Sequence, residues 1–331
     1  MTLNMLRNFR ERQPHFLDLL ILAAVSALVI FPALGQNRHW ASREVRHAEI
    51  VREMAESGDY LVPKLLGKTY FDKPPVMHAA AAVLTRIVGE PSMTLVRMPS
   101  ATAGILGILA TYGVGLLLLD RNTALIGAFA LLGMPGYSLM ARQARPDMIL
   151  CFSVIVSCLF LCLGMRKYRC IPRMLYFTLA GLLAGLGVVT KGPFGVLFPI
   201  FFAVLVPFRR QDLIRPRIGW IIFGFGVLAA IALWAVPAYF RDSGVYLHRV
   251  IFQPDLDVSK GGNGGPFYYV WMVLFLALPL SLFLPVAIVD LRRRGYSAML
   301  AVAGAIFIVI SCIPQNDDTI YCLCIHFLRL G

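Results

Sequence analysis

Long apolar runs bounded by charged residues dominate the hydrophobic pattern of the chain. A bilayer core about 30 Å thick needs roughly 20 apolar residues per helix. On this basis, the pattern predicts nine spanning helices, at Phe16–Leu34, Pro99–Leu119, Ala124–Met140, Met148–Gly164, Leu175–Val189, Phe194–Pro207, Ile218–Tyr239, Phe267–Val289 and Tyr296–Ile313. A cleaved signal peptide explains the first run less well, because the run is long for one and lacks a clear cleavage site. The predicted fold class is all-α, in a polytopic integral membrane protein.

The longest polar stretch of the first half, residues 36–75, follows the first apolar run. Within residues 41–57, alanines and valines recur at spacings of three and four, which predicts an amphipathic helix lying along the membrane interface. Three prolines predict an irregular segment after it. The apolar run His78–Val88 is too short to span comfortably, so we expect a second interfacial or re-entrant piece. Together these form a first outer loop over residues 36–98.

Composition and charge support a membrane protein and indicate its orientation. Of 331 residues, 58% are hydrophobic and 15% are charged, which excludes an ordinary soluble domain. The net charge of +13 would suggest nucleic acid in a soluble protein, but here the Lys/Arg clusters fall in alternate loops, as the positive-inside rule requires. We therefore expect no nucleic-acid partner, a cytoplasmic N-terminus and a multi-pass protein of the plasma (inner) membrane. The seven cysteines show no convincing disulfide or metal spacing.

The outer side then collects most of the chemically interesting residues. Asp147 begins an apolar run and has Arg142 and Arg145 beside it. A helix cap is one explanation for this carboxylate. Two cations beside one carboxylate would equally suit a phosphate, a metal-bound anion or a structural ion pair.

Three other sets of outer residues have both an ordinary and a functional interpretation. Asp72 and Lys73 precede two prolines, and a solvated turn is the simpler explanation. Glu44 and His47 share one helical face, as a charged interfacial surface or as part of a metal or acid/base site. Lys191 either extends its charge to the interface or binds a phosphate. The glycine-rich segment 248–266 fits a linker better than a gate.

The order and spacing of five motifs resemble a known family. They read R-E-V-R-H-A-E-I-V-R-E-M-A-E-S-G-D-Y-L-V-P, Y-F-D-K-P-P, V-R-M-P-S-A, A-R-P-D-M and T-K-G-P. Together they resemble the membrane glycosyltransferases of the protein O-mannosyltransferase and lipid A aminoarabinose transferase group, over about residues 16–313. The resemblance implies a GT-C fold. It also implies inverting transfer of a sugar from a polyprenyl-phosphate carrier to a glycolipid or protein acceptor at the outer, periplasmic face.

The resemblance also implies roles for residues. Asp72 corresponds to an acid near a divalent metal in some members, and no organic cofactor is implied. Lys73 matches the residue expected to hold the donor phosphate, and Asp147 an acid facing the active-site cavity. Arg46 and Arg145 are further cations available to the departing phosphate, and Glu44 or Asp147 is available as the base.

Two departures from the family pattern leave other hypotheses open. The family usually has Asp-Glu at the start of the first motif, whereas this chain has Arg43-Glu44. Either Glu44 takes over or the chain is a catalytically inactive remnant. Family members continue beyond 331 residues, so we expect a transferase domain over residues 1–313 and an atypical tail at 314–331 from a truncated or frameshifted reading frame. A lipid or solute transporter fits less well, because the charges lie at helix ends and no internal repeat is evident.

Overall fold

The computed structural model describes residues 2–32, 34–35, 42–166, 170–205 and 217–252, together with residues 281, 285, 288, 289 and 293. The side chains of residues 2–14, 42, 43, 170, 205 and 252 are not described. The helices run α1 Thr2–Ile30, α2 Ser42–Ser57, α3 Val76–Val88, α4 Met93–Leu118, α5 Arg121–Gly133, α6 Pro135–Ala141, α7 Pro146–Arg166, α8 Cys170–Lys191, α9 Phe194–Leu205, α10 Arg217–Arg241 and α11 Val245–Phe252. The strands β1 Lys64–Leu65 and β2 Lys68–Thr69 form an antiparallel pair.

Four described helices are long and apolar enough to cross a bilayer: α4, α7, α8 and α10. The pair α5–α6 makes a fifth if it counts as one broken span, since the two helices meet at 66°. The break has a local cause, because Pro135 lacks the N–H that would continue α5. Within the described residues, the apolar helical stretches His15–Ile30 and Phe194–Val204 are shorter than a full span. The last two predicted spans, 267–289 and 296–313, and the tail 314–331 lie outside the continuously described residues.

The predicted first outer loop, residues 36–98, contains helices α2 and α3 where two helical pieces were expected. Gly89 ends α3 in a left-handed conformation, with φ of 91°. The segment between α2 and α3, predicted to be irregular, instead contains the short β hairpin. Leu66 and Gly67 turn its chain with φ of 53° and 73°. Positive φ is unusual for leucine and ordinary for glycine, so Gly67 lowers the conformational cost of this tight turn.

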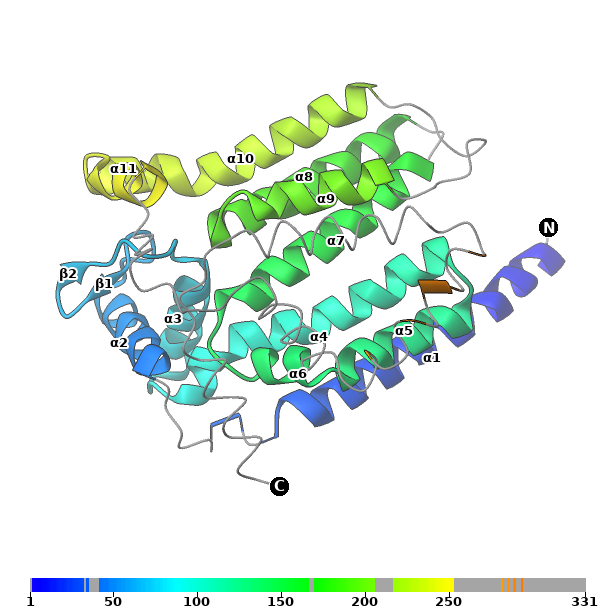
Figure 1. Cartoon of the computed structure of the whole chain (residues 1–331), viewed down its shortest axis with the longest axis horizontal. Coiled ribbons are helices and arrows are strands. Elements are labelled where there is room, and N and C mark those ends of the chain that lie inside the picture. Colours follow the sequence, from blue (N-terminus) through cyan, green and yellow to red (C-terminus); the bar gives the residue numbers. More distant parts are fainter. Residues whose placement is uncertain are drawn as a thin grey trace.

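The long helices pack into a bundle in which α7 lies against α4 and α8, and α8 lies against α10 (Figure 1). Helices α8 and α10 approach closely at two glycines. A Cβ added to Gly226 would lie 2.8 Å from the Thr178 carbonyl oxygen and 3.1 Å from the Gly181 Cα. Helix α1 is joined to the bundle by the buried Asp18. This carboxylate accepts hydrogen bonds of 2.6 Å from Arg121 and of 2.5 Å from the Tyr112 hydroxyl.

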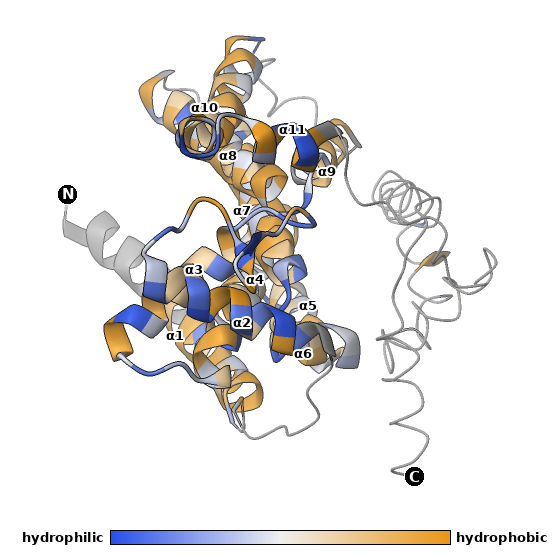
Figure 2. Ribbon diagram, turned by 90° about the vertical axis from the view of Figure 1, so that its left-hand side faces the viewer, coloured by the Kyte–Doolittle hydropathy of each residue, from blue (hydrophilic) through white to orange (hydrophobic). Residues whose placement is uncertain are grey.

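The short elements α2, α3, β1, β2 and α11 gather at one end of the bundle, remote from the N-terminal end of α1 (Figure 1). We call this the α2–α11 end. Figure 2, which looks onto it, shows hydrophilic residues along α2 and in the segments between the helices, with apolar helices behind. The residues that begin α7 and end α8 reach the same end of the bundle. The outer segments predicted from the sequence therefore converge.

Candidate active site

Asp147 lies in the first turn of α7 and forms an ion pair with Lys191, the last residue of α8. A carboxylate near a helix N-terminus and a cation near a C-terminus each suit the helix dipole. About a third of each side chain is exposed, 34% for Asp147 and 37% for Lys191. Arg145 and Lys73 lie close enough for their charges to act on the same carboxylate. One carboxylate therefore faces several cations contributed by three segments of the chain.

Arg142, predicted beside Asp147, turns away from it. Its guanidinium donates a 2.7 Å hydrogen bond to the Pro32 carbonyl oxygen at the end of α1. Lys191 is the partner that Asp147 finds instead, 44 residues along the chain. The sequence contained a signal for this pairing only in the fact that both turns were expected on one face of the membrane.

A buried ion pair fixes the turn that precedes Asp147. The carboxylate of Glu44, on α2, accepts hydrogen bonds of 3.0 and 2.7 Å from Arg97, on α4. It also accepts a 3.0 Å hydrogen bond from the backbone N–H of Ala144. Arg97 is 2% exposed and donates a further 2.5 Å bond to the Leu34 carbonyl oxygen. Glu44 thus has a structural role: its hydrogen bonds join α2, α4 and the 142–147 turn.

Ser100 anchors the same turn one helical turn further along α4. Its hydroxyl donates a 2.8 Å hydrogen bond to the Arg145 carbonyl oxygen and accepts a 3.0 Å bond from the Arg145 N–H. Arg97 and Ser100 belong to the motif V-R-M-P-S-A, for which the sequence indicated no role. Ser100 bonds the backbone of Arg145 directly, and Arg97 reaches the same turn through Glu44.

Asp72 and Lys73 lie between β2 and α3. The Tyr70 hydroxyl donates a 2.8 Å hydrogen bond to Asp72. Burial, and after it the charge of Asp72, raises the pKa of Tyr70, so the phenol remains a proton donor. Arg46, on α2, is close enough to oppose this rise in the pKa of Tyr70. The Lys73 carbonyl oxygen accepts a 3.3 Å hydrogen bond from the Tyr246 hydroxyl on α11.

A pair of buried histidines joins α2 to α3. His47 Nδ1 lies 2.8 Å from His78 Nε2, and the two side chains are 7% and 1% exposed. Burial, with the charges of Lys73 and Arg46 as smaller causes, lowers the pKa of His47 to about 4. Burial also lowers the pKa of His78. Both rings are therefore neutral at pH 7. The structure brings His47 to His78, whereas Glu44, on the same helical face, pairs with Arg97.

The donor set around Asp72 does not fit a divalent metal site. Such ions take several oxygen or nitrogen ligands, and the described residues contain no group of three or more His, Cys, Asp or Glu side chains placed to share one ion. The hydroxyl of Tyr70 already occupies one oxygen of Asp72. The metal implied by the family resemblance therefore has no set of ligands within the part of the chain that the structure describes.

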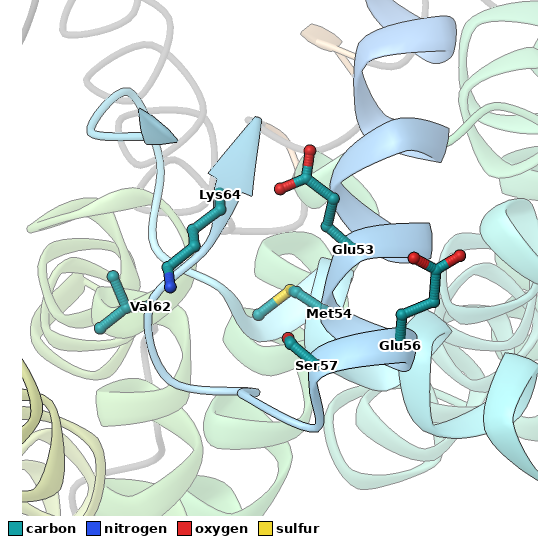
Figure 3. Close-up of a pocket in the computed structure, with 6 residues that line it drawn as sticks. All are labelled: Glu53, Met54, Glu56, Ser57, Val62 and Lys64. Atoms are coloured by element: carbon teal, nitrogen blue, oxygen red, sulfur yellow. The ribbon is translucent and has the colours of Figure 1, made fainter. Parts of the chain in front are cut away.

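A hollow of about 350 Å³ opens beside the site, not in it. In Figure 3, Glu53 and Glu56 on α2 line one side. Val62, which precedes β1, and Lys64, its first residue, line the other. Met54 and Ser57 complete the lining. Asp147, Lys191, Asp72 and Lys73 are not among these residues, so the hollow is separate from the cluster of cations around Asp147.

The chain is similar in sequence to known glycosyltransferases. A family model described as dolichyl-phosphate-mannose-protein mannosyltransferase matches residues 72–236. An undecaprenyl phosphate-alpha-4-amino-4-deoxy-L-arabinose arabinosyl transferase of Pseudomonas aeruginosa is 30% identical over 239 residues, 68% of this chain and 41% of the relative. A protein of the same name from Aeromonas hydrophila is 28% identical over 271 residues, 80% of this chain and 48% of the relative. The chain thus spans less than half the length of these two relatives.

The fold has solved counterparts. The crystal structure of ArnT from Cupriavidus metallidurans bound to undecaprenyl phosphate superposes with a TM-score of 0.75 at 22% identity. The superposition covers 91% of this chain and 56% of that one. An oligosaccharyltransferase of Archaeoglobus fulgidus superposes with a TM-score of 0.55 at 15% identity, covering 92% and 47%. The described helices therefore adopt the fold of these membrane proteins.

Proposed function

Because the chain belongs to the ArnT-like family of membrane glycosyltransferases, we propose that it transfers a sugar from a polyprenyl-phosphate carrier to an acceptor, with inversion at the anomeric carbon. The relatives are named for a sugar on undecaprenyl phosphate, which supports this class of donor. The acceptor is a glycolipid, such as a lipid A-like molecule, or a protein. The reaction takes place on the outer face of the plasma (inner) membrane, where the α2–α11 end lies.

The observation that carries the proposal is the Asp147 carboxylate with cations around it. Lys191 pairs with it, and the charges of Lys73 and Arg145 act on it. Such an arrangement suits a phosphate that departs with increasing negative charge. Arg46, on α2 and near Tyr70, adds a further cation at the same end. Since phosphate is already a good leaving group, fixed cations are sufficient to help it depart.

The chemical step needs one base. The acceptor hydroxyl oxygen attacks the anomeric carbon, and the bond from that carbon to the phosphate oxygen breaks with its electron pair staying on the phosphate. Asp147 takes the proton of the attacking hydroxyl. When the donor phosphate binds Lys191, it competes with the ion pair of Asp147 and leaves that carboxylate available to the acceptor. No step in this scheme passes through a metal ion.

Glu44 has a positioning role in this scheme. Its carboxylate already accepts hydrogen bonds from Arg97 and from the Ala144 N–H. The residue is only 7% exposed, so an acceptor hydroxyl has little access to this carboxylate. Asp147, a third exposed, is the better candidate for the base. The side chain of Arg43, which stands where the family usually has an acid, is outside the described residues.

The test is sugar transfer by the purified protein in liposomes, with a polyprenyl-phosphate-linked sugar as donor and a glycolipid or a protein as acceptor. We expect Asp147→Asn to lower kcat by at least about 100-fold, the usual effect of losing a general base. Lys73→Ala should mainly raise the KM for the donor. Asp242→Asn, at the end of α10, is the control. Undiminished transfer by Asp147→Asn would remove that residue from the mechanism.

A parallel measurement separates this proposal from its alternatives. If the wild-type protein binds undecaprenyl phosphate but transfers no sugar, the inactive remnant is the better explanation. If a labelled solute crosses the proteoliposome membrane without forming a covalent product, the protein is a transporter.

A further inference from the structure

Lys73 precedes two prolines, and its carbonyl oxygen accepts a hydrogen bond from a residue far away in the sequence. Pro74 and Pro75 have no backbone N–H, so the local chain offers the carbonyl oxygen fewer donors than usual. The hydrogen bond comes from Tyr246, 173 residues later, whose hydroxyl oxygen lies 3.3 Å away. The backbone of the residue expected to bind the donor phosphate is thus held by α11.

Tyr246 is itself firmly held. Its side chain is 0% exposed. Its ring lies 6.0 Å from that of Phe71 and 6.2 Å from that of Trp234, the latter at 85°. Burial raises the pKa of Tyr246, so its hydroxyl keeps the proton that it donates. The guanidinium of Arg249, also on α11, lies 4.8 Å from the centre of the Phe71 ring.

Two more contacts join the same pair of segments. Arg241, at the end of α10, forms a 3.1 Å ion pair with the largely buried carboxylate of Asp59. The Trp234 indole N–H donates a 3.4 Å hydrogen bond to the Leu61 carbonyl oxygen. The region from α10 to α11 therefore contacts residues 59–73 along their length. Of these three contacts, the hydrogen bond from Tyr246 is the one made to Lys73 itself.

We propose that Tyr246 is a positioning residue for Lys73, which sets where the lysine ammonium meets the phosphate of the donor. The inference rests on the proposed function for the identity of that ligand. It makes α11 part of the donor site although none of its side chains need touch the substrate. An error of about 1 Å in the position of such a group is enough to change binding and rate.

The test compares Tyr246→Phe, which removes only the hydroxyl, with Tyr239→Phe, an exposed tyrosine of α10. The first readout does not depend on activity: the rate at which an amine-reactive reagent labels Lys73, measured by mass spectrometry, with Lys64 and Lys68 as internal references. We expect Tyr246→Phe to raise the relative labelling of Lys73 about 3-fold. The expected increase is small because one hydrogen bond makes only a modest net contribution. Tyr239→Phe should leave it unchanged.

The second readout is donor binding. Tyr246→Phe should weaken the binding of undecaprenyl phosphate and raise the donor KM by about 3- to 10-fold, with kcat changed less than about 2-fold. A second variant, Phe71→Leu, loosens the same contact from the other side and should shift both readouts in the same direction. Unchanged labelling of Lys73 in both variants would overturn the proposal, even if both proteins were less stable.

The two proposals fail in different ways. If Lys73 labelling rises in Tyr246→Phe but the wild-type protein binds no undecaprenyl phosphate, the positioning of Lys73 stands and the proposed donor is wrong. If the wild type binds the lipid phosphate and the variant binds it equally well with unchanged labelling, the donor stands and the role of Tyr246 is wrong.

Discussion

Arg97 shows how one buried charge can organise several segments. A guanidinium that is 2% exposed cannot remain charged without compensation, and Glu44 provides it through two hydrogen bonds. The same carboxylate also accepts a hydrogen bond from the Ala144 N–H. The cost of burial thus forces α2, α4 and the 142–147 turn into one arrangement. The sequence identified Glu44 as a candidate base, but its partner lies 53 residues away and its helical pattern gave no sign of it.

This arrangement predicts a non-additive double-mutant cycle. Arg97→Met leaves the buried Glu44 carboxylate unpaired and should lower the free energy of unfolding by about 3–5 kcal/mol. Adding Glu44→Met removes the orphaned charge, so the double variant should be more stable than Arg97→Met alone. Chemical denaturation in detergent micelles measures all four proteins. Additive losses from the two substitutions would mean that the pair is not coupled.

At the scale of elements, local periodicity predicted the helices well. The amphipathic pattern over 41–57 gave α2, at Ser42–Ser57, within a residue at its start. The apolar run at 78–88 gave α3, which begins two residues earlier, at Val76. The predicted span at 124–140 proved to be two helices, because Pro135 interrupts the backbone hydrogen bonding. Contacts between elements, such as that of His47 with His78, depend on the folded arrangement, and periodicity does not encode them.

The histidine pair between α2 and α3 predicts a pH-dependent stability. The folded pKa of His47 is about 4, below its usual 6.5. Between these values the unfolded chain binds more protons than the folded one. Stability should therefore be complete above about pH 6.5 and fall as the pH decreases towards 4, by at most about 1.4 kcal/mol per pH unit for each such histidine.

The variant His47→Gln isolates this effect. It removes one titrating ring, so the melting temperature should fall less steeply between pH 6.5 and 4.5 than in the wild type. His248→Gln, which changes an exposed histidine of α11, should keep the wild-type slope. Equal slopes in His47→Gln and the wild type would mean that His47 is not neutral in the folded protein.

For the molecule as a whole, the predicted membrane crossings correctly grouped three polar segments at one end of the bundle. Residues 36–75, the turn at 142–147 and the turn at 190–193 were expected on one side, and the described parts of all three meet at the α2–α11 end. Four to five of the predicted nine spans are long enough in the described residues to cross a bilayer. The pairing of Asp147 with Lys191 could not be predicted from the sequence, because a lysine or an arginine from any of several loops could have paired with that carboxylate.

The orientation can be measured directly. We expect a cysteine placed at Lys68, an exposed residue of β2, to react with a membrane-impermeant thiol reagent added outside intact cells. A cysteine at Asn122, at the opposite end of the bundle, should react only after the membrane is opened, because the positive-inside rule assigns that turn to the cytoplasm. Labelling is scored above that of the parent protein, which has its own cysteines. The reverse pattern would invert the topology.

The brace between α10–α11 and residues 59–73 also bears on the order of events during synthesis. Asp59, Leu61 and Lys73 leave the ribosome long before their partners Arg241, Trp234 and Tyr246. A nascent chain that has inserted α4 through α8 already contains Lys73, Asp147 and Lys191, yet the segment bearing Lys73 has no brace. On the proposed role of Lys73, the donor site is therefore completed by α11, the last described helix to be made. The segment that bears Lys73 then takes its final position only after the helices of the bundle have assembled.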